Sequence, residues 1–362
     1  MSQLLGLSIR WPRILPPRGI RDISMPPPFP KSLQQLLKSV SRSIYLTLWV
    51  LPAKIRPQIG LAYLLARTTD TIADTGVVPL DRRIESLHAL RDRIQRRRSD
   101  PVQFGEFVRS QGSPAERSLL ERHEELLAVL HNCSPPDRQL IEEVVTIITS
   151  GQELDLTRFG EASPAAILPL RNDAELDDYT YRVAGCVGEF WTKMCRAHLF
   201  PNAALDDRSL LANGVRFGQG LQLVNILQDV PADLRLGRCY LPAEALSRHN
   251  LSPADLLLPA NESRLRPLYN GYLAKAEAHL AAGWLYTNTL PHTCLRVRLA
   301  CAWPILIGAK TIARLKTDNF LDPQRRVKIR RAEVRQIMLR SVLLLPWPKA
   351  WQGLFKPGTR VG

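Results

Sequence analysis

The stretch that decides the fold of this chain is GLAYLLARTTDTIAD, residues 60–74. Its apolar residues recur at helical spacing, and the main polar interruptions are Arg67, Asp70, Asp74 and three threonines. Four residues turn an α-helix by about 400°, so the two aspartates lie about one turn apart on one face. We therefore predict a helix over residues 56–74 that carries a pair of neighbouring carboxylates.

A second stretch has the same design: GLQLVNILQDVPAD, residues 220–233. It carries Asp229 and Asp233, again four residues apart, on an otherwise largely apolar segment. Pro231 lies between them, where it removes an amide donor and disfavours the helical conformation of Val230. We predict a helix over residues 206–229 and place the second pair at a kink or a helix end.

Paired carboxylates repel each other, and burying them is costly unless a cation neutralises them. Mg²⁺ prefers oxygen ligands and is commonly held by one or two carboxylates together with substrate phosphates. Two such helices facing each other would hold a diphosphate between them through Mg²⁺. The alternative is that each pair lies on a solvated helix face, and the apolar flanks of both stretches favour a cavity instead.

Helical periodicity continues from residue 31 onward, while strand signals are nearly absent. The predicted fold is all-α, with one domain at residues 31–345 whose helices surround a central cavity. Pro267 is expected to begin a helix over residues 268–290. Residues 1–30 are basic and proline-rich and are predicted to be a disordered tail, and residues 346–362 a C-terminal tail.

Composition narrows the function of the 362-residue chain, which is 45% hydrophobic and carries a net charge of +15. A protein of this charge could bind nucleic acid, an anionic membrane surface or an anionic substrate. The sequence contains no nucleic-acid-binding motif, which disfavours the first of these. The six cysteines form no metal-binding spacing and are expected to be reduced core residues. No segment is long and apolar enough to span a bilayer, and no signal peptide is evident, so a cytoplasmic protein is expected.

Five stretches within residues 38–345 resemble the squalene/phytoene synthase family. They are SRSIY (41–45) with LP (51–52), YLLARTTDTIAD (63–74), YTYRVAGCVG (179–188), QLVNILQDVPAD (222–233) with GRCYLP (237–242), and VKIR (327–330). The last is typical of squalene synthases. The resemblance implies an isoprenoid-synthase helical fold and a prenyltransferase that uses Mg²⁺.

The resemblance also implies roles for individual residues. Mg²⁺ and the diphosphates would be held by Asp70, Asp74, Asn225, Asp229 and Asp233. Substrate would be bound by Arg42, Ser43, Tyr63, Arg67, Gln222, Asn225 and Arg238. Tyr181 would be catalytic, since aromatic faces stabilise carbocations, and Lys328 and Arg330 would bind the phosphates of NADPH.

Plainer roles are open for several of these residues. Arg67 could simply pair with Asp70 or Asp74 along its helix, and the two tyrosines could be core residues. The cations of the VKIR segment could belong to a solvated basic surface. Gly185 and Gly188 admit either a close approach of another segment or prenyl tail, or ordinary helix packing.

The implied reaction joins two farnesyl diphosphates head to head through presqualene diphosphate to squalene, with NADPH as the hydride donor. Alternatives are a phytoene synthase acting on C20 substrates, or a non-reductive C30 synthase that releases presqualene diphosphate, dehydrosqualene or hydroxysqualene. The chain departs from the family pattern at Arg182, Gln228 and Ala232, which leaves product handling open. Two rivals from other classes are a non-catalytic helical protein that binds isoprenoid or membrane, and a basic nucleic-acid binder.

A water-insoluble product implies peripheral contact with a membrane. Two predictions are open for Trp347, Trp351 and Phe355, with Lys349 and Lys356: an interfacial foot near the C-terminus, or a disordered tail. The sequence leaves the oligomeric state open, a monomer included.

Overall fold

The computed structural model describes residues 30–41, 45–322 and 327–356. Helices dominate these residues, and the only strands in them are the two-residue β1 (Leu168–Pro169) and β2 (Arg238–Cys239), which pair in parallel. The all-α prediction is therefore confirmed. Arg42, Ser43 and nearly all of the predicted N-terminal tail lie outside the described residues.

Contacts divide the chain into two compact units, each described here by itself. Unit 1 comprises residues 1–157 and 190–203, and unit 2 comprises residues 158–189 and 204–362. None of the helices in the described part of the chain is long and apolar enough to cross a membrane. All six cysteines are free, and five of them are buried, as expected for reduced core residues.

Unit 1 is organised around one buried helix. Its helices are α1 (Lys31–Val40), α2 (Tyr45–Val50), α3 (Arg56–Asp74), α4 (Leu80–Ile94), α5 (Gly105–Ser110), α6 (Pro114–Glu121), α7 (His123–His131) and most of α8 (Pro135–Arg158). Pro57 lies in the first turn of α3, where its missing amide costs nothing. α3 packs against α1, α2, α4, α6 and α7, which explains why nearly every residue after Gln58 is buried.

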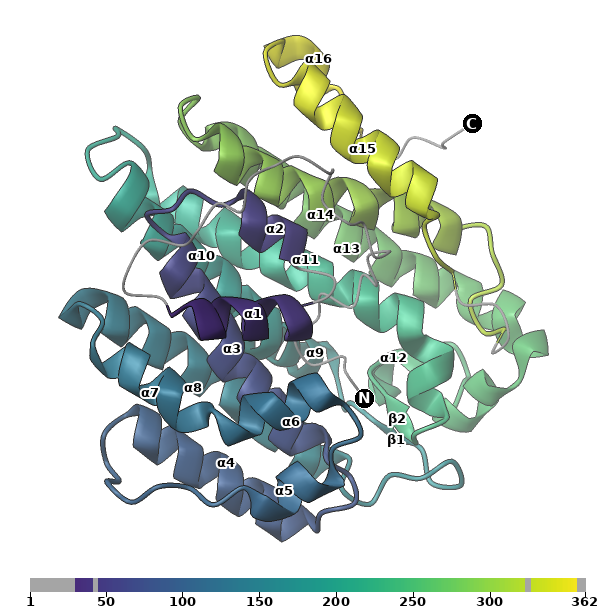
Figure 1. The fold of residues 1–362 in the computed structure, drawn as a ribbon. Coiled ribbons are helices and arrows are strands. Elements are labelled where there is room, and N and C mark those ends of the chain that lie inside the picture. Colours follow the sequence, from purple (N-terminus) through teal and green to yellow (C-terminus); the bar gives the residue numbers. More distant parts are fainter. Residues whose placement is uncertain (1–29, 42–44, 323–326, 357–362) are drawn as a thin grey trace. The chain divides into compact units, whose positions relative to one another are not determined.

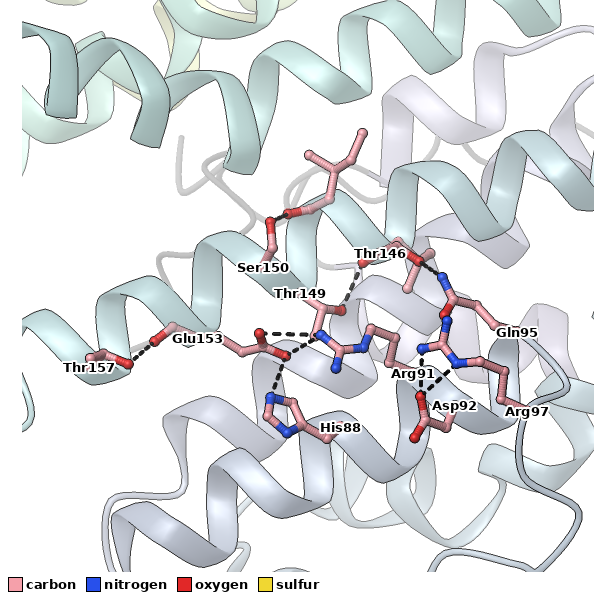
Figure 2. Close-up of polar contacts among 12 residues, drawn as sticks. His88, Arg91, Asp92, Gln95, Arg97, Thr146, Thr149, Ser150, Glu153 and Thr157 are labelled. Carbon is pink, nitrogen blue, oxygen red and sulfur yellow. Dashed lines mark hydrogen bonds and ion pairs between the residues drawn. The ribbon is translucent and has the colours of Figure 1, made fainter.

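A polar seam joins α4 to α8 in unit 1 (Figure 2). The Glu153 carboxylate accepts a hydrogen bond from Arg91 at 3.0 Å and lies 3.2 Å from His88. One turn further along, at the end of α4, the Gln95 amide donates to the Thr146 hydroxyl of α8 at 2.9 Å. These contacts lie on partly exposed side chains, so they fix the register of the two helices more than they stabilise the fold.

Unit 2 is built on one long helix in the same way. Its elements are α9 (Asp173–Thr180), a π-helical turn (Tyr181–Gly185), the start of α10 (Cys186–Leu199), α11 (Asp207–Leu234), α12 (Ala243–Ser247), 3₁₀ turns at Pro253–Leu257 and Pro259–Asn261, α13 (Glu262–Thr289), α14 (Leu295–Leu315), α15 (Arg331–Leu344) and α16 (Pro348–Gln352). α11 packs against α13, α14, α9 and the π-turn, and α15 covers α14 (Figure 1).

Prolines inside two helices correct the sequence-based boundaries. α11 continues through Pro231 and ends at Leu234, beyond the predicted bound at residue 229, so the second pair lies in the last turns of the helix, as the helix-end alternative predicted. A proline at 231 leaves the carbonyl of Leu227 without its usual donor, and the buried Tyr269 hydroxyl fills that place at 2.8 Å. Likewise α13 begins at Glu262 rather than after Pro267, because a proline so near the helix start removes only one hydrogen bond.

The C-terminal segment also departs from prediction. Trp351 is fully buried, stacks on Trp284 at 5.4 Å between ring centroids, and donates its indole N–H to Asn288 at 2.9 Å. Phe355 is buried against Trp284 as well. These two aromatics therefore belong to the core of unit 2 and not to an interfacial foot, whereas Trp347 is 61% exposed.

Candidate active site

The first acidic cluster comprises Tyr63, Arg67, Asp70 and Asp74 on α3 of unit 1. Asp70 is fully buried, Arg67 is nearly so, and Asp74 at the helix end is half-buried. The three threonines around them return their hydroxyls to backbone carbonyls one turn back, as Thr71 does to Arg67 at 2.8 Å. The polar groups that remain for other partners on this helix are therefore the charged ones.

Arg67 links two acids. One guanidinium nitrogen contacts Asp70, three residues along α3, and the other contacts Glu116 in the first turn of α6. Burial disfavours the charged guanidinium, but Asp70, Tyr63 and Glu116 together raise the pKa of Arg67 above its ordinary value. Arg67 thus remains a cation beside the carboxylate pair, and the pairing with Asp70 considered from the sequence is confirmed.

Asp70 has unused bonding capacity. Arg67 contacts one carboxylate oxygen, and the other has no hydrogen-bond partner among the described residues. Burial raises the pKa of Asp70 above the ordinary carboxyl value, against the Arg67 guanidinium, which lowers it. A buried oxygen that lacks a donor is costly, and a hard cation is a partner that would suit it.

Tyr63 lies one turn before Arg67 and is half-buried. Its hydroxyl approaches the carbonyl of Val40 at 3.4 Å, at the end of α1 and two residues before Arg42. Burial raises the pKa of Tyr63, so the side chain is a neutral phenol at physiological pH. Arg42 and Ser43 lie outside the described residues, and their roles stay predictions.

The second acidic cluster comprises Gln222, Asn225, Asp229 and Asp233 on α11 of unit 2. All four are buried, although each carries a polar or charged group. Their spacing of three or four residues places them along one stripe of the helix. Since α11 is continuous through Pro231, Asp233 stays in line with Asp229.

The amides of this cluster are short of partners. Neither amide atom of Asn225 has a hydrogen-bond partner among the described residues, and the same holds for the side-chain oxygen of Gln222. A buried amide without a partner is costly, so these amides are available to a ligand or to a water molecule. Their oxygens, with the carboxylates of Asp229 and Asp233, form the all-oxygen donor set that Mg²⁺ prefers.

Each cluster supplies its carboxylates in a pair. Within the described ranges, no three acidic, histidine or cysteine side chains are arranged to hold a metal by themselves. A metal bound to either pair would need further oxygens, such as those of a substrate diphosphate. The residues therefore fit Mg²⁺ shared with a diphosphate better than a metal site made of protein alone.

Arg238 lies just beyond the second cluster, on β2. It helps to line a small cavity together with Asp233 and Val230. Its guanidinium lies 5.8 Å from the ring centroid of Phe159, a cation–π contact that orients the side chain. Arg238 thus lines the same cavity as Asp233, and its role in substrate binding stays a prediction.

Tyr181 begins the π-helical turn that joins α9 to α10. It is half-buried, and its hydroxyl donates to the Glu189 carboxylate at 3.1 Å. The neighbouring Arg182, where the family often has an aromatic residue, pairs with Asp178 at 2.9 Å on a partly exposed face. Arg182, which departs from the family pattern, therefore has its ion-pair partner one turn earlier in the same segment.

The VKIR segment is fastened next to the second cluster. Gln228 donates to the carbonyl of Val327, and Arg314 donates to the carbonyl of Lys328. Gln228 stands where the family often has arginine, so this departure has a structural role. Lys328 and Arg330 keep exposed side chains, which leaves both the cofactor-binding and the solvated interpretation available to them.

The structure adds three residues that the sequence analysis missed. Glu116 contacts Arg67, Glu189 accepts from Tyr181, and Tyr269 donates to Leu227 beside Pro231. Glu116 had a local signal, because Ser113 and Pro114 mark a helix start that favours an acid in its first turn. Tyr269 acts across 42 residues of sequence and had none.

Known proteins resemble this chain in sequence and in fold. The squalene/phytoene synthase family, as a sequence model, matches residues 37–333. The squalene synthase of Schizosaccharomyces pombe is 28% identical over 322 residues, covering 86% of this chain and 64% of that protein. The bifunctional lycopene cyclase/phytoene synthase of Phaeosphaeria nodorum is 26% identical over 245 residues, covering 66% of this chain and 38% of that protein.

The fold has solved counterparts. The ligand-bound structure of TcSQS superposes with a TM-score of 0.69 at 20% identity, covering 91% of this chain and 92% of that one. The chain spans less than two thirds of the length of the two curated relatives named above.

Proposed function

The chain belongs to the squalene/phytoene synthase family, whose members are prenyltransferases, and from that premise we propose that it joins two farnesyl diphosphates head to head. The observation that supports this most directly is the pair of buried acidic clusters on α3 and α11, each with two carboxylates four residues apart.

The protein residues have separate tasks in this reaction. Asp70, Asp74, Asp229 and Asp233 would hold Mg²⁺, which would supply Lewis-acid stabilisation of the departing pyrophosphate. Arg67 exchanges its contact with Asp70 for a diphosphate oxygen, for which its forked guanidinium is well suited. Asn225 and Gln222 complete the oxygen set, and Tyr63 and Tyr181 present ring faces to the carbocations.

The reductive half of the reaction is proposed on narrower support. NADPH would supply the hydride for conversion of presqualene diphosphate to squalene, with pyrophosphate as the leaving group. Lys328 and Arg330 would hold the phosphates of NADPH, and the support for this is that both are exposed cations on a segment fastened to α11 beside Asp229. If they do not, the product is a non-reduced C30 compound.

A second candidate is phytoene synthesis from C20 substrates. It is favoured by relatives of that kind, such as the Phaeosphaeria nodorum protein. The VKIR segment and its attachment to α11 favour the C30 reaction instead.

Incubation of the purified chain with farnesyl diphosphate, Mg²⁺ and NADPH, followed by mass spectrometry of the products, tests the proposal. We expect squalene, no condensation after chelation of Mg²⁺, and little turnover of geranylgeranyl diphosphate in a parallel reaction. Presqualene diphosphate with NADPH unconsumed would overturn the reductive half alone. Absence of any C30 product would overturn the reaction itself.

We also propose peripheral membrane contact, through a surface that differs from the predicted foot. Leu339, Val342 and Leu343 on α15 and the adjoining Trp347 are each between 48% and 61% exposed. Exposed cations at Arg335, Arg340 and Lys349 flank them. This combination suits an anionic lipid surface, where apolar side chains enter the interface and cations meet the headgroups.

Sedimentation with vesicles tests this contact. We expect the protein to bind vesicles that contain phosphatidylserine, and Trp347→Ala with Leu343→Ser to weaken binding several-fold while condensation in detergent is unchanged. Phe355→Leu, in the core, is a control that should leave vesicle binding intact. Equal binding by the double variant would rule out this surface.

A further inference from the structure

The hydrogen bond from Tyr181 to Glu189 depends on the π-helical turn. The two residues are eight positions apart, with the five-residue π-turn Tyr181–Gly185 between them. In a regular α-helix eight residues rotate by about 800°, which leaves the side chains about 80° apart. A π-turn absorbs about one extra residue, so that they stand on nearly the same face. Their contact is thus a consequence of the irregular turn.

Gly185 provides the space for this contact. A Cβ at this position would lie 3.1 Å from Cδ2 of Tyr181, and 3.2 Å and 3.3 Å from side-chain atoms of Gln219 and Val215. The tyrosine ring therefore extends over the glycine toward Glu189. The groups that approach Gly185 are the tyrosine ring itself and α11, so the close approach considered from the sequence is here also helix packing.

The π-turn and the start of α10 are fixed against α11 by backbone contacts. A Cβ on Gly188 would lie 1.9 Å from the carbonyl oxygen of Gly214, and one on Gly218 would lie 2.1 Å from that of Ala184. Neither position admits a side chain without moving the backbone. The stripe of α11 that holds these glycines continues, at spacings of three or four residues, into Gln222 and Asn225. Tyr181 is therefore fixed relative to the second acidic cluster.

We propose that Glu189 is a positioning residue for the reaction proposed above, on which this inference rests. Its carboxylate accepts the phenol hydrogen bond and holds the Tyr181 ring in one rotation beside the second cluster. A hydrogen bond donated to a carboxylate also places more negative charge on the phenol. The ring face then attracts a carbocation more strongly. Glu189 itself acts only through Tyr181.

A double-mutant cycle tests this role, with Glu189→Gln, Tyr181→Phe and the combined variant. We expect each single variant to lower kcat for condensation of farnesyl diphosphate by about tenfold, the effect expected for a lost charge-assisted bond, with KM changed less than about twofold. The double variant should be no slower than Tyr181→Phe alone. Asp178→Asn, which removes an acid from the same segment, is the matched control and should retain wild-type kcat.

Other outcomes separate this inference from the proposed function. Wild-type kcat in Glu189→Gln, or losses that multiply in the double variant, would overturn the role of Glu189 while the wild-type enzyme still condenses substrate. A wild-type protein without condensation would overturn the proposed function first. Glu189→Asp keeps the charge on a shorter arm and covers the case in which Glu189→Gln does not fold. We expect partial loss of kcat from it, and full activity would also count against the role.

Discussion

The two acidic clusters carry similar motifs but are held in different ways. On α3 the carboxylates are balanced by charge, since Arg67 contacts both Asp70 and Glu116. On α11 the cluster is fixed by backbone geometry, through the glycine contacts with the π-turn and the Tyr269 hydroxyl beside Pro231. The same Asp-x-x-x-Asp spacing thus rests on electrostatics in one unit and on close packing in the other.

This difference teaches where each cluster can tolerate change. A charge partner can be exchanged, so in the proposed reaction Arg67 could leave Asp70 for a diphosphate if Mg²⁺ took its place at that buried carboxylate, while Glu116 still neutralised the guanidinium. At Gly188 and Gly218, in contrast, an added Cβ would lie less than 2.2 Å from a backbone carbonyl oxygen, so neither glycine can be replaced unless the backbone moves. We expect changes on α3 to act on catalysis and changes along the glycine stripe of α11 to act on stability.

The largest expected effect comes from removing a carboxylate from each cluster. Asp70→Asn and Asp229→Asn should each lower turnover by well over about tenfold, because each weakens a metal ligand set. Circular dichroism should show the fold retained. Steady-state kinetics with farnesyl diphosphate measures the loss, and full activity in both variants would remove the carboxylates from the mechanism.

A smaller effect is expected from Gly218→Ala on the glycine stripe. The new methyl group would meet the carbonyl of Ala184, and overpacking of this kind costs about 1–3 kcal/mol. Thermal or urea unfolding measures it. Gly271→Ala is the matched control, since a Cβ there on α13 meets nothing within 4 Å, and it should be neutral or stabilising. Equal stability of the two variants would contradict the close contact.

Tyr269→Phe tests how α11 passes through Pro231. Loss of the Tyr269 hydroxyl leaves the buried Leu227 carbonyl without a donor, which should lower the unfolding free energy by about 1–3 kcal/mol. Pro231→Ala restores an amide that can bond to this carbonyl. Tyr269→Phe should therefore lower the unfolding free energy less in the Pro231→Ala background than in the wild-type background. Additive losses would show that the tyrosine acts elsewhere.

The smallest expected effect is a pH dependence in unit 2. Burial, with help from Arg216 and Lys275 and against Asp177, lowers the pKa of His279 to about 4. Between that value and about 6.5 the unfolded state binds a proton that the folded state does not, so stability should fall as the pH is lowered through this window. After solvent screening we expect about 1 kcal/mol. His279→Gln should flatten the decline, and an unchanged slope would exclude this histidine.

Much of the fold followed from local pattern. The bounds of α3 at residues 56 and 74 were predicted as observed, because apolar periodicity acts over adjacent turns of one helix. The predicted helices over residues 206–229 and 268–290 exist, but their ends were wrong by several residues. Both errors came from prolines whose local cost is offset elsewhere, by Tyr269 or by position near a helix start.

The same distinction holds for the candidate site, since local features were predicted and contacts that depend on folding were not. Aspartates at a spacing of four are visible in the sequence, and so is the resemblance of their surroundings to a family. The acid that shares Arg67, the acid that orients Tyr181 and the burial of Trp351 are not, since each depends on a residue brought close only by folding or by an irregular turn.

What the sequence determined by itself is the set of helices and the pairing of acids along them, because both depend on helical periodicity over adjacent turns. Tertiary structure decided which of those groups are neutralised, which remain short of partners, and whether a proline ends a helix. Those outcomes depend on a donor, acceptor or glycine contributed by a distant segment, and no local spacing encodes that contribution.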